Sequence, residues 1–125
     1  MPTYHGSCHC GAVRFEVALK APITRLLECD CSVCTKKGIV HHPVADHELS
    51  ISSGHEGLVL YQFHSAEAHH WFCGTCGIHT HGRPRNNPGR FTVNTRCLDG
   101  YEAIRAGAEM AYFDGKNHPK DAISE

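Results

Sequence analysis

Eight cysteines carry most of the reactive chemistry in this sequence, and spacing divides seven of them into two groups. The first group joins a C-x-C pair to a distant C-x-x-C pair: Cys8, Cys10, Cys73 and Cys76. In C-x-C the two side chains leave the same side of an extended segment. In C-x-x-C the glycines Gly74 and Gly77 allow a tight turn that aims both sulfurs one way. Four thiolates complete a tetrahedral zinc shell, so we expect a structural zinc here.

The second group is a triplet with the spacing C-x-C-x-x-C: Cys29, Cys31 and Cys34. Lys36 and Lys37 follow at once, and nearby positive charge favours the thiolate form of cysteine. Three protein ligands with one open position are typical of a catalytic zinc, whereas a structural site recruits a fourth protein ligand. The residues that could close the shell are Cys97, His41, His42, His47 and His55. Spacing alone supports an open and a closed site equally.

Short alternating segments must position both groups. Period-2 patterns predict about eight short strands, at 13–19, 24–28, 38–44, 47–51, 58–63, 68–73, 78–82 and 91–96. Residues 101–110 predict one or two helical turns, which Gly107 weakens. The polar tail from about residue 116 is expected to be loose. We therefore expect residues 1–125 to form a single, mostly-β domain.

Composition excludes several classes of function. The chain has 125 residues, a formal net charge of −1 and 41% hydrophobic residues. Its basic residues are scattered, so we expect no nucleic-acid partner. No apolar run approaches the ~20 residues of a membrane helix, and the first ten residues do not form a secretion signal. We therefore expect a cytoplasmic protein, in which thiolate metal ligands are favoured over disulfides.

Four motifs together resemble one known family. They are GSCHCGAVRFEV (6–17), CDCSVCTKKG (29–38), WFCGTCGIHT (71–80) and VNTRCLDG (93–100). They hold all eight cysteines and span nearly the whole chain. The chain resembles the glutathione-dependent formaldehyde-activating enzyme family, whose domain also occurs in centromere protein V.

The resemblance implies a β-tent fold of twisted antiparallel sheets with two zinc ions per chain. It implies a structural zinc at Cys8, Cys10, Cys73 and Cys76. It implies a second zinc at Cys29, Cys31 and Cys34, with an exchangeable fourth position, so that this ligand is expected to come from solution. The implied activity is that of a carbon–sulfur lyase of the S-(hydroxymethyl)glutathione synthase type.

The implied substrates are formaldehyde, or another small aldehyde, and glutathione or a similar thiol. The histidines that could supply an acid are His41, His42 and His47, and Arg83, Arg85 and Arg90 could bind the carboxylates of the thiol. The enzymes that give the family its name are longer than this chain. A non-catalytic zinc-binding module, or a carrier of thiol or zinc, is therefore the alternative hypothesis.

Overall fold

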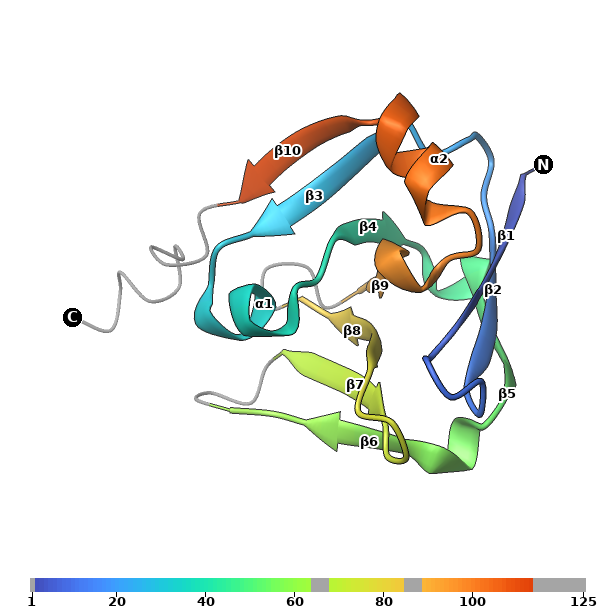
Figure 1. Ribbon diagram of the computed structural model, residues 1–125, viewed down its shortest axis with the longest axis vertical. Coiled ribbons are helices and arrows are strands. Elements are labelled where there is room, and N and C mark those ends of the chain that lie inside the picture. The colour runs from blue at the N-terminus through green and yellow to red at the C-terminus, as the bar shows by residue number, and fades with distance from the viewer. Residues whose placement is uncertain (1, 64–67, 85–88, 114–125) are drawn as a thin grey trace.

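Ten strands form two sheets in the computed structural model, which describes residues 2–63, 68–84 and 89–113 (Figure 1). The smaller sheet is antiparallel and has the order β1 (Thr3–Ser7), β2 (Arg14–Ala18), β5 (Leu49–Ser53). The larger sheet has the order β10 (Glu109–Phe113), β3 (Arg25–Cys29), β4 (His41–Val44), β9 (Phe91–Asn94), β8 (His79–Arg83), β7 (His69–Cys73), β6 (Leu58–Tyr61). The predicted mostly-β, β-tent fold is confirmed.

Helices are few and short. The α-helices are α1 (Ser32–Lys37) and α2 (Tyr101–Gly107), and the 3-10 turns are η1 (Asp46–Glu48), η2 (His55–Gly57) and η3 (Thr95–Cys97). Among the described residues, none of the helices has the length and apolar character needed to cross a bilayer. The tail from residue 116 lies outside the described residues.

Three features of the fold differ from the sequence prediction. Strand β1 was not predicted, because only one of its five residues is buried and its alternation is weak. The one or two helical turns expected in 101–110 are present as α2, which ends at Gly107, but strand β10, which begins at Glu109, was not predicted. Strand β10 pairs with β3 in parallel, so the larger sheet is not purely antiparallel. Strand β1 forms as the hairpin partner of β2, and β10 forms along the distant strand β3; local propensity contains neither pairing.

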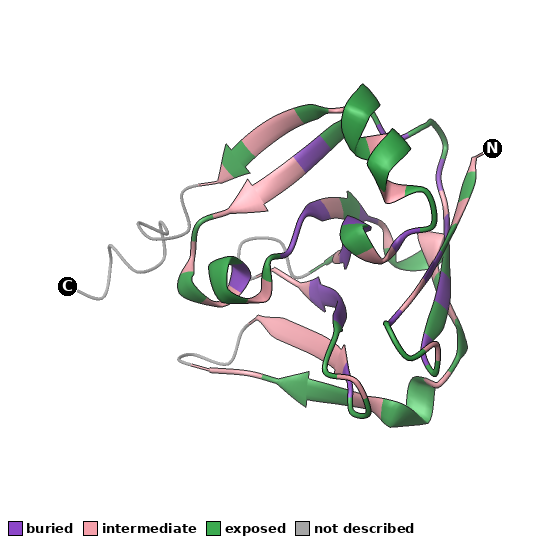
Figure 2. Ribbon diagram, viewed as in Figure 1, coloured by how far each residue is buried: buried purple, intermediate pink, exposed green. Residues whose placement is uncertain are grey.

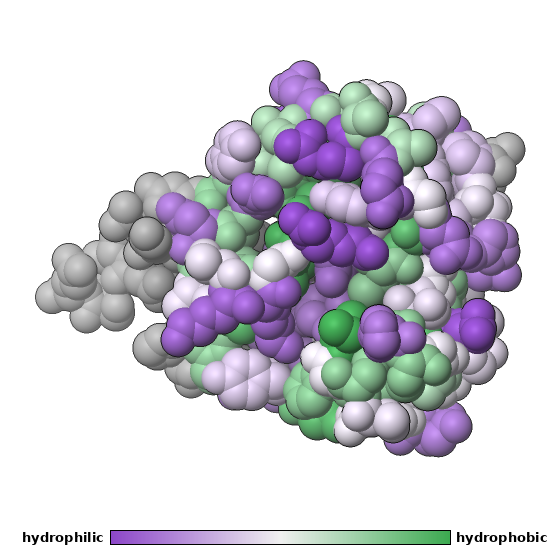
Figure 3. Space-filling view, in the orientation of Figure 1, coloured by the Kyte–Doolittle hydropathy of each residue, from purple (hydrophilic) through white to green (hydrophobic). Residues whose placement is uncertain are grey.

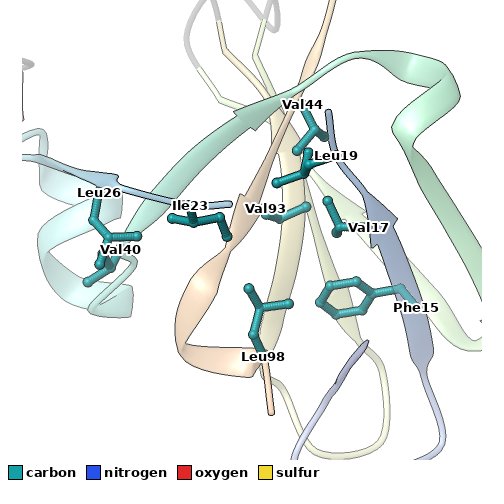
Figure 4. Packing of buried hydrophobic residues seen from close by; sticks show 9 residues of the cluster. All are labelled: Phe15, Val17, Leu19, Ile23, Leu26, Val40, Val44, Val93 and Leu98. Atoms are coloured by element: carbon teal, nitrogen blue, oxygen red, sulfur yellow. The ribbon is translucent and has the colours of Figure 1, made fainter. Parts of the chain in front are cut away.

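The main core lies between the two sheets (Figure 4). Strand β2 alternates buried and exposed residues and turns Phe15 and Val17 inward, as its period predicts. Gly6 lies over the Phe15 ring, and a Cβ there would be 2.4 Å from Phe15 Cζ. Buried residues also mark β4 and β8, which cross the middle of the molecule (Figure 2). The second cysteine group lies beside this buried part of the sheet, because Cys34 contacts His41 of β4.

Candidate metal centres

The first cysteine group forms a four-cysteine cluster that links the two sheets. Cys8 and Cys10 follow β1, whereas Cys73 ends β7 and Cys76 lies in the turn before β8. Their four sulfurs all lie within 4.8 Å of one another, with 3.6 Å between Cys8 and Cys10 and 3.7 Å between Cys10 and Cys73. A tetrahedron with Zn–S bonds of about 2.3 Å has edges of about 3.8 Å. A disulfide needs about 2.05 Å, so these sulfurs are spaced to share a metal.

Local backbone geometry aims the sulfurs. In the C-x-x-C turn, Gly77 N–H donates to Cys73 O at 2.8 Å, and Gly77 has φ of 82°. Backbone N–H groups donate to sulfur, from Val13 to Cys8 at 3.3 Å and from Thr75 to Cys73 at 3.4 Å. Such donors favour thiolates and are typical of metal-binding turns.

Two expectations about this cluster are corrected by the structure. Cys8 and Cys10 do not lie on an extended strand, because the chain turns at Gly11, which has φ of 81°. Gly74 has no positive φ; a Cβ there would approach Gly57 O to 3.0 Å, so the glycine provides space. The sulfurs still converge, through turns and close packing.

Backbone donors favour the thiolate at two of the four cysteines. Backbone N–H donation from Cys10 and then Ile78 lowers the pKa of Cys76 to about 6. Backbone donation from Cys76 and Thr75 lowers the pKa of Cys73. At Cys10 the backbone donor of Ala12 lowers the pKa, but hydrogen-bond sharing with Cys8 and then burial raise it to about 11. Thiolates are the form of cysteine that binds metal, so the donor set fits zinc.

The second group, hereafter the triplet (Cys29, Cys31 and Cys34), surrounds the start of α1. Cys29 is the last residue of β3, Cys31 is the N-cap of α1, and Cys34 lies in its first turn. The Cys34 N–H donates to Cys31 Sγ at 3.5 Å, and Gly38 ends the helix with φ of 68°. The six-residue helix α1 therefore brings the three sulfur atoms of the C-x-C-x-x-C motif together at its start. The three sulfurs lie within 4.8 Å of one another.

Negative charge in the triplet gathers first on Cys31. Hydrogen bonds from Cys29 and then Cys34 lower the pKa of Cys31, and the same sharing raises the pKa of the other two thiols. Three thiolates so close together need a cation to offset their repulsion. Lys37 supplies part of this charge: burial lowers its pKa, and the field of Cys34 opposes that change. The triplet can therefore hold a metal cation and is compatible with zinc.

Only one of the residues predicted to close the triplet reaches it. His41 Nε2 lies 3.3 Å from Cys34 Sγ, and its Nδ1 lies 3.0 Å from Thr92 Oγ1. Within the described ranges, no fourth His, Cys, Asp or Glu ligand atom lies within 4.8 Å of all three sulfurs. His41 thus contacts a ligand sulfur from outside the triplet.

Cys97, the other strong candidate, lies elsewhere. Its thiol donates to His79 O at 3.5 Å, and burial raises its pKa to about 12. The fields that also raise this pKa come from Cys8 and Cys76, which belong to the four-cysteine cluster. Cys97 therefore packs in the interior near the first group and does not join the triplet.

The sequence analysis did not single out His79, which is buried, or His70, which is half-buried. His79 is 4% exposed, and neither of its ring nitrogens has a hydrogen-bond partner among the described residues. His70 lies beside it, with ring centroids 6.0 Å apart. Burial lowers the pKa of His79 to about 2 and that of His41 to about 4, so these imidazoles are neutral near pH 7. All four residues of HTHG are buried in β8, so period-2 alternation gave no signal that His79 and His81 would lie inside.

A pocket of about 430 Å³ opens beside the triplet. Its walls include Cys29 and Cys34 from the triplet, the 38–40 segment, and Arg96. Figure 3 shows strongly hydrophilic side chains gathered in the middle of this face, over α1 and η3. The volume lies within the range of small-molecule sites.

Within the described residues, the arginines predicted to bind carboxylates are absent from the lining of this pocket. Arg83 pairs with Asp46 through two contacts of 3.1 Å, and its Cζ lies 3.9 Å from the Phe91 ring centroid. Arg85 lies outside the described residues, and Arg90 is not among the lining residues. Arg96, from the VNTRCLDG motif, occupies the position instead. Sequence spacing gave no sign that Arg96 would face the triplet across a pocket.

Comparison with known proteins agrees with this geometry. The family model described as "Glutathione-dependent formaldehyde-activating enzyme" matches residues 3–114. A crystal structure of a Rhodobacter sphaeroides protein is similar, with 40% sequence identity and a TM-score of 0.78. That similarity covers 87% of this chain and 99% of the other.

Proposed function

The chain belongs to the glutathione-dependent formaldehyde-activating enzyme family, and on this premise we propose that it is a zinc-dependent carbon–sulfur lyase. Its substrate would be the adduct of formaldehyde, or another small aldehyde, with glutathione or a similar thiol. One observation carries the proposal: three cysteine ligands converge at the wall of a pocket, without a fourth ligand among the described residues. Three ligands and an accessible fourth position are typical of catalytic zinc.

The two clusters would hold two zinc ions with different roles. The four-cysteine cluster has a complete shell and would be structural, through Cys8, Cys10, Cys73 and Cys76. A zinc held by Cys29, Cys31 and Cys34 would lower the pKa of a thiol at its open position and polarise a nearby oxygen. In this proposal the three cysteines of the triplet take part in catalysis only as ligands of this ion.

The reaction needs little from the protein beyond binding and charge balance. In the synthetic direction a new S–C bond forms, the carbonyl π bond breaks, and the thiol proton ends on the new hydroxyl oxygen. The pocket admits both reactants beside Cys29 and Cys34. Holding two reactants together replaces a bimolecular encounter by an oriented one. The Lys37 ammonium offsets the negative charge that the thiolates bring together.

His41 is suited to support the triplet and less suited to be its acid. It is 8% exposed, it contacts Cys34 Sγ, and Thr92 holds its other nitrogen. A neutral imidazole in this position can donate one hydrogen bond to the sulfur and fix the ring, as groups around metal ligands often do. Neither His42 nor His47 contacts the triplet in the described part of the chain, so the structure gives no support to either as the acid.

All eight cysteines are unpaired, which suits a reducing compartment, and we place the protein in the cytoplasm. Residues 1–125 would act as one domain. The alternative roles, a non-catalytic zinc-binding module or a carrier of thiol or zinc, use the same triplet but require no turnover.

Exchange spectroscopy tests the proposal. The zinc-loaded protein is added to formaldehyde and glutathione at equilibrium, and the rate of exchange between free and adduct carbon is measured. We expect faster exchange than in buffer, and we expect Cys31→Ser to return the rate to that of buffer.

Two results separate the alternatives. An exchange rate equal to that in buffer, with the second zinc retained, would reject the lyase activity. Loss of the second zinc to glutathione, with the first retained, would indicate a zinc carrier. Metal content after desalting distinguishes these outcomes.

A further inference from the structure

We propose that Arg96 is a substrate-binding residue that selects thiols carrying a carboxylate. The inference rests on the proposed thiol site at the triplet and names the group that reads the remainder of the substrate. Arg96 and Cys29 line the same pocket of about 430 Å³, so one small molecule can reach both.

Buried neighbours fix the backbone from which Arg96 projects. The Asn94 side chain caps η3 by accepting from Arg96 N–H at 3.3 Å, and it donates to His79 O at 2.9 Å. Thr95 is fully buried, and its N–H and hydroxyl both donate to Val40 O at 2.8 Å. Val40 itself lines the pocket. Asn94 and Thr95 are therefore buried and fixed, whereas Arg96 lies on the exposed side and lines the pocket.

The guanidinium of Arg96 is available for an anion. Arg96 is exposed, and its Cζ lies 5.4 Å from the Tyr101 ring centroid, so an aromatic face supports the side chain. Within the described residues no carboxylate forms an ion pair with it, in contrast to Arg83, which Asp46 holds. A planar guanidinium offers two parallel donors that match the two oxygens of a carboxylate.

The charges of the pocket walls set the direction of the substrate. Glu28 and Asp30 flank Cys29 on the β3 side, and Arg96 is the only cationic residue among those that line the pocket in the described structure. A carboxylate is repelled by the Glu28 side chain and attracted by Arg96. A thiol that places its sulfur at Cys29 and Cys34 would therefore extend its carboxylate toward η3.

Thiol binding without aldehyde tests this inference separately from turnover. The protein is loaded with cobalt(II) in place of zinc, and thiol binding is followed by the sulfur-to-cobalt absorption band. The probes are 3-mercaptopropionate, 2-mercaptoethanol and glutathione. The variants are Arg96→Gln, which removes the charge, Arg96→Lys, which keeps it, and Arg105→Gln, a matched control on the exposed face of α2.

We expect Arg96→Gln to weaken binding of 3-mercaptopropionate and glutathione by about 10-fold and to leave 2-mercaptoethanol nearly unchanged. Arg96→Lys should restore part of this loss, and Arg105→Gln should match the wild type. Because each thiol is compared between proteins, differences in intrinsic thiol pKa cancel. Metal content and thermal unfolding verify that the variants remain folded and loaded.

Equal weakening of all three thiols by Arg96→Gln, or no weakening of any, would overturn the inference. Absence of thiol binding by the wild type would overturn it together with the proposed thiol site. Selective binding through Arg96 with no acceleration of aldehyde exchange would support the inference while rejecting the lyase activity.

Discussion

The unequal roles of the two cysteine groups predict that Cys73→Ser will damage the fold far more than Cys31→Ser. Cys73 is 1% exposed and joins the β7–β8 turn to Cys10, which is 63 residues away in sequence. Cys31 binds only within the short segment from Cys29 to Cys34. A metal that closes a long loop constrains the unfolded chain more than one that closes a short loop.

The expected cost of Cys73→Ser follows from what else holds that end of the molecule. Besides the cysteines, only Val13 is fully buried in this small cluster, which contributes at most about 3 kcal/mol. Zinc binding in small structural sites contributes about 10 to 16 kcal/mol, so one of four thiolates represents roughly 3 kcal/mol. Whole domains are stable by only about 5 to 15 kcal/mol. A loss of about 3 kcal/mol should lower the Tm by about 12 °C.

Cys31→Ser should be much milder for a local reason. Cys31 is the N-cap of α1, and its side chain accepts from Cys34 N–H. Serine is among the best N-cap residues, so the helix start should survive the change. We expect a folded protein that has lost the second zinc and keeps the first.

Metal analysis and thermal unfolding at fixed free zinc test both variants together. The reasoning is refuted if Cys31→Ser unfolds the chain as completely as Cys73→Ser does. It is also refuted if Cys73→Ser keeps two zinc ions and the Tm of the wild type. Either result would mean that the division into structural and reactive sites is wrong.

Two further predictions concern buried residues outside both clusters. The Cys97→Ala variant should keep two metals per chain, because the Cys97 thiol contacts His79 O and belongs to neither cysteine group. The free energy of unfolding should fall by about 1 kcal/mol. Loss of either metal in elemental analysis would contradict this prediction. Burial lowers the pKa of His81 in the folded state to about 4, against about 6.5 when unfolded. Between these two pH values His81 is protonated in the unfolded chain and neutral in the folded one. The free energy of unfolding that depends on neutral His81 is therefore fully present above pH 6.5. It falls by about 3 kcal/mol as the pH drops toward 4. His81→Phe, which keeps the stacking on Trp71, should flatten the pH dependence of the unfolding free energy in this window, and an unchanged slope would count against it.

The sequence predicted the membership of both cysteine groups, because thiolate ligands for one metal recur at short, characteristic spacings. Two C-x-C or C-x-x-C pairs and one C-x-C-x-x-C triplet could be assigned without knowing the fold, and the structure brings each group within 4.8 Å. Period-2 alternation likewise identified β2 as a half-buried strand. These signals are local, so they survive without tertiary information.

The predictions that failed depended on contacts between distant segments. Residues 101–110 contain the expected one or two helical turns, but β10 was not predicted, because it forms along the edge of the distant strand β3. Arg83 was one of three arginines that could bind the carboxylates of the thiol, but it pairs with Asp46, 37 residues away. The burial of His79 likewise follows from the pairing of β7, β8 and β9.

The sequence by itself determined that the chain is mostly β and has two groups of cysteines spaced to share a metal, because both properties depend on short-range spacing. Tertiary structure alone decided what surrounds the triplet. It placed His41 against Cys34, kept Cys97 apart, and set Arg96 across a pocket from Cys29. The groups next to the open position of a metal site, and the residues that line a pocket, belong to the segments that pack beside them in the fold. That packing depends on long-range pairing, which residue spacing does not record.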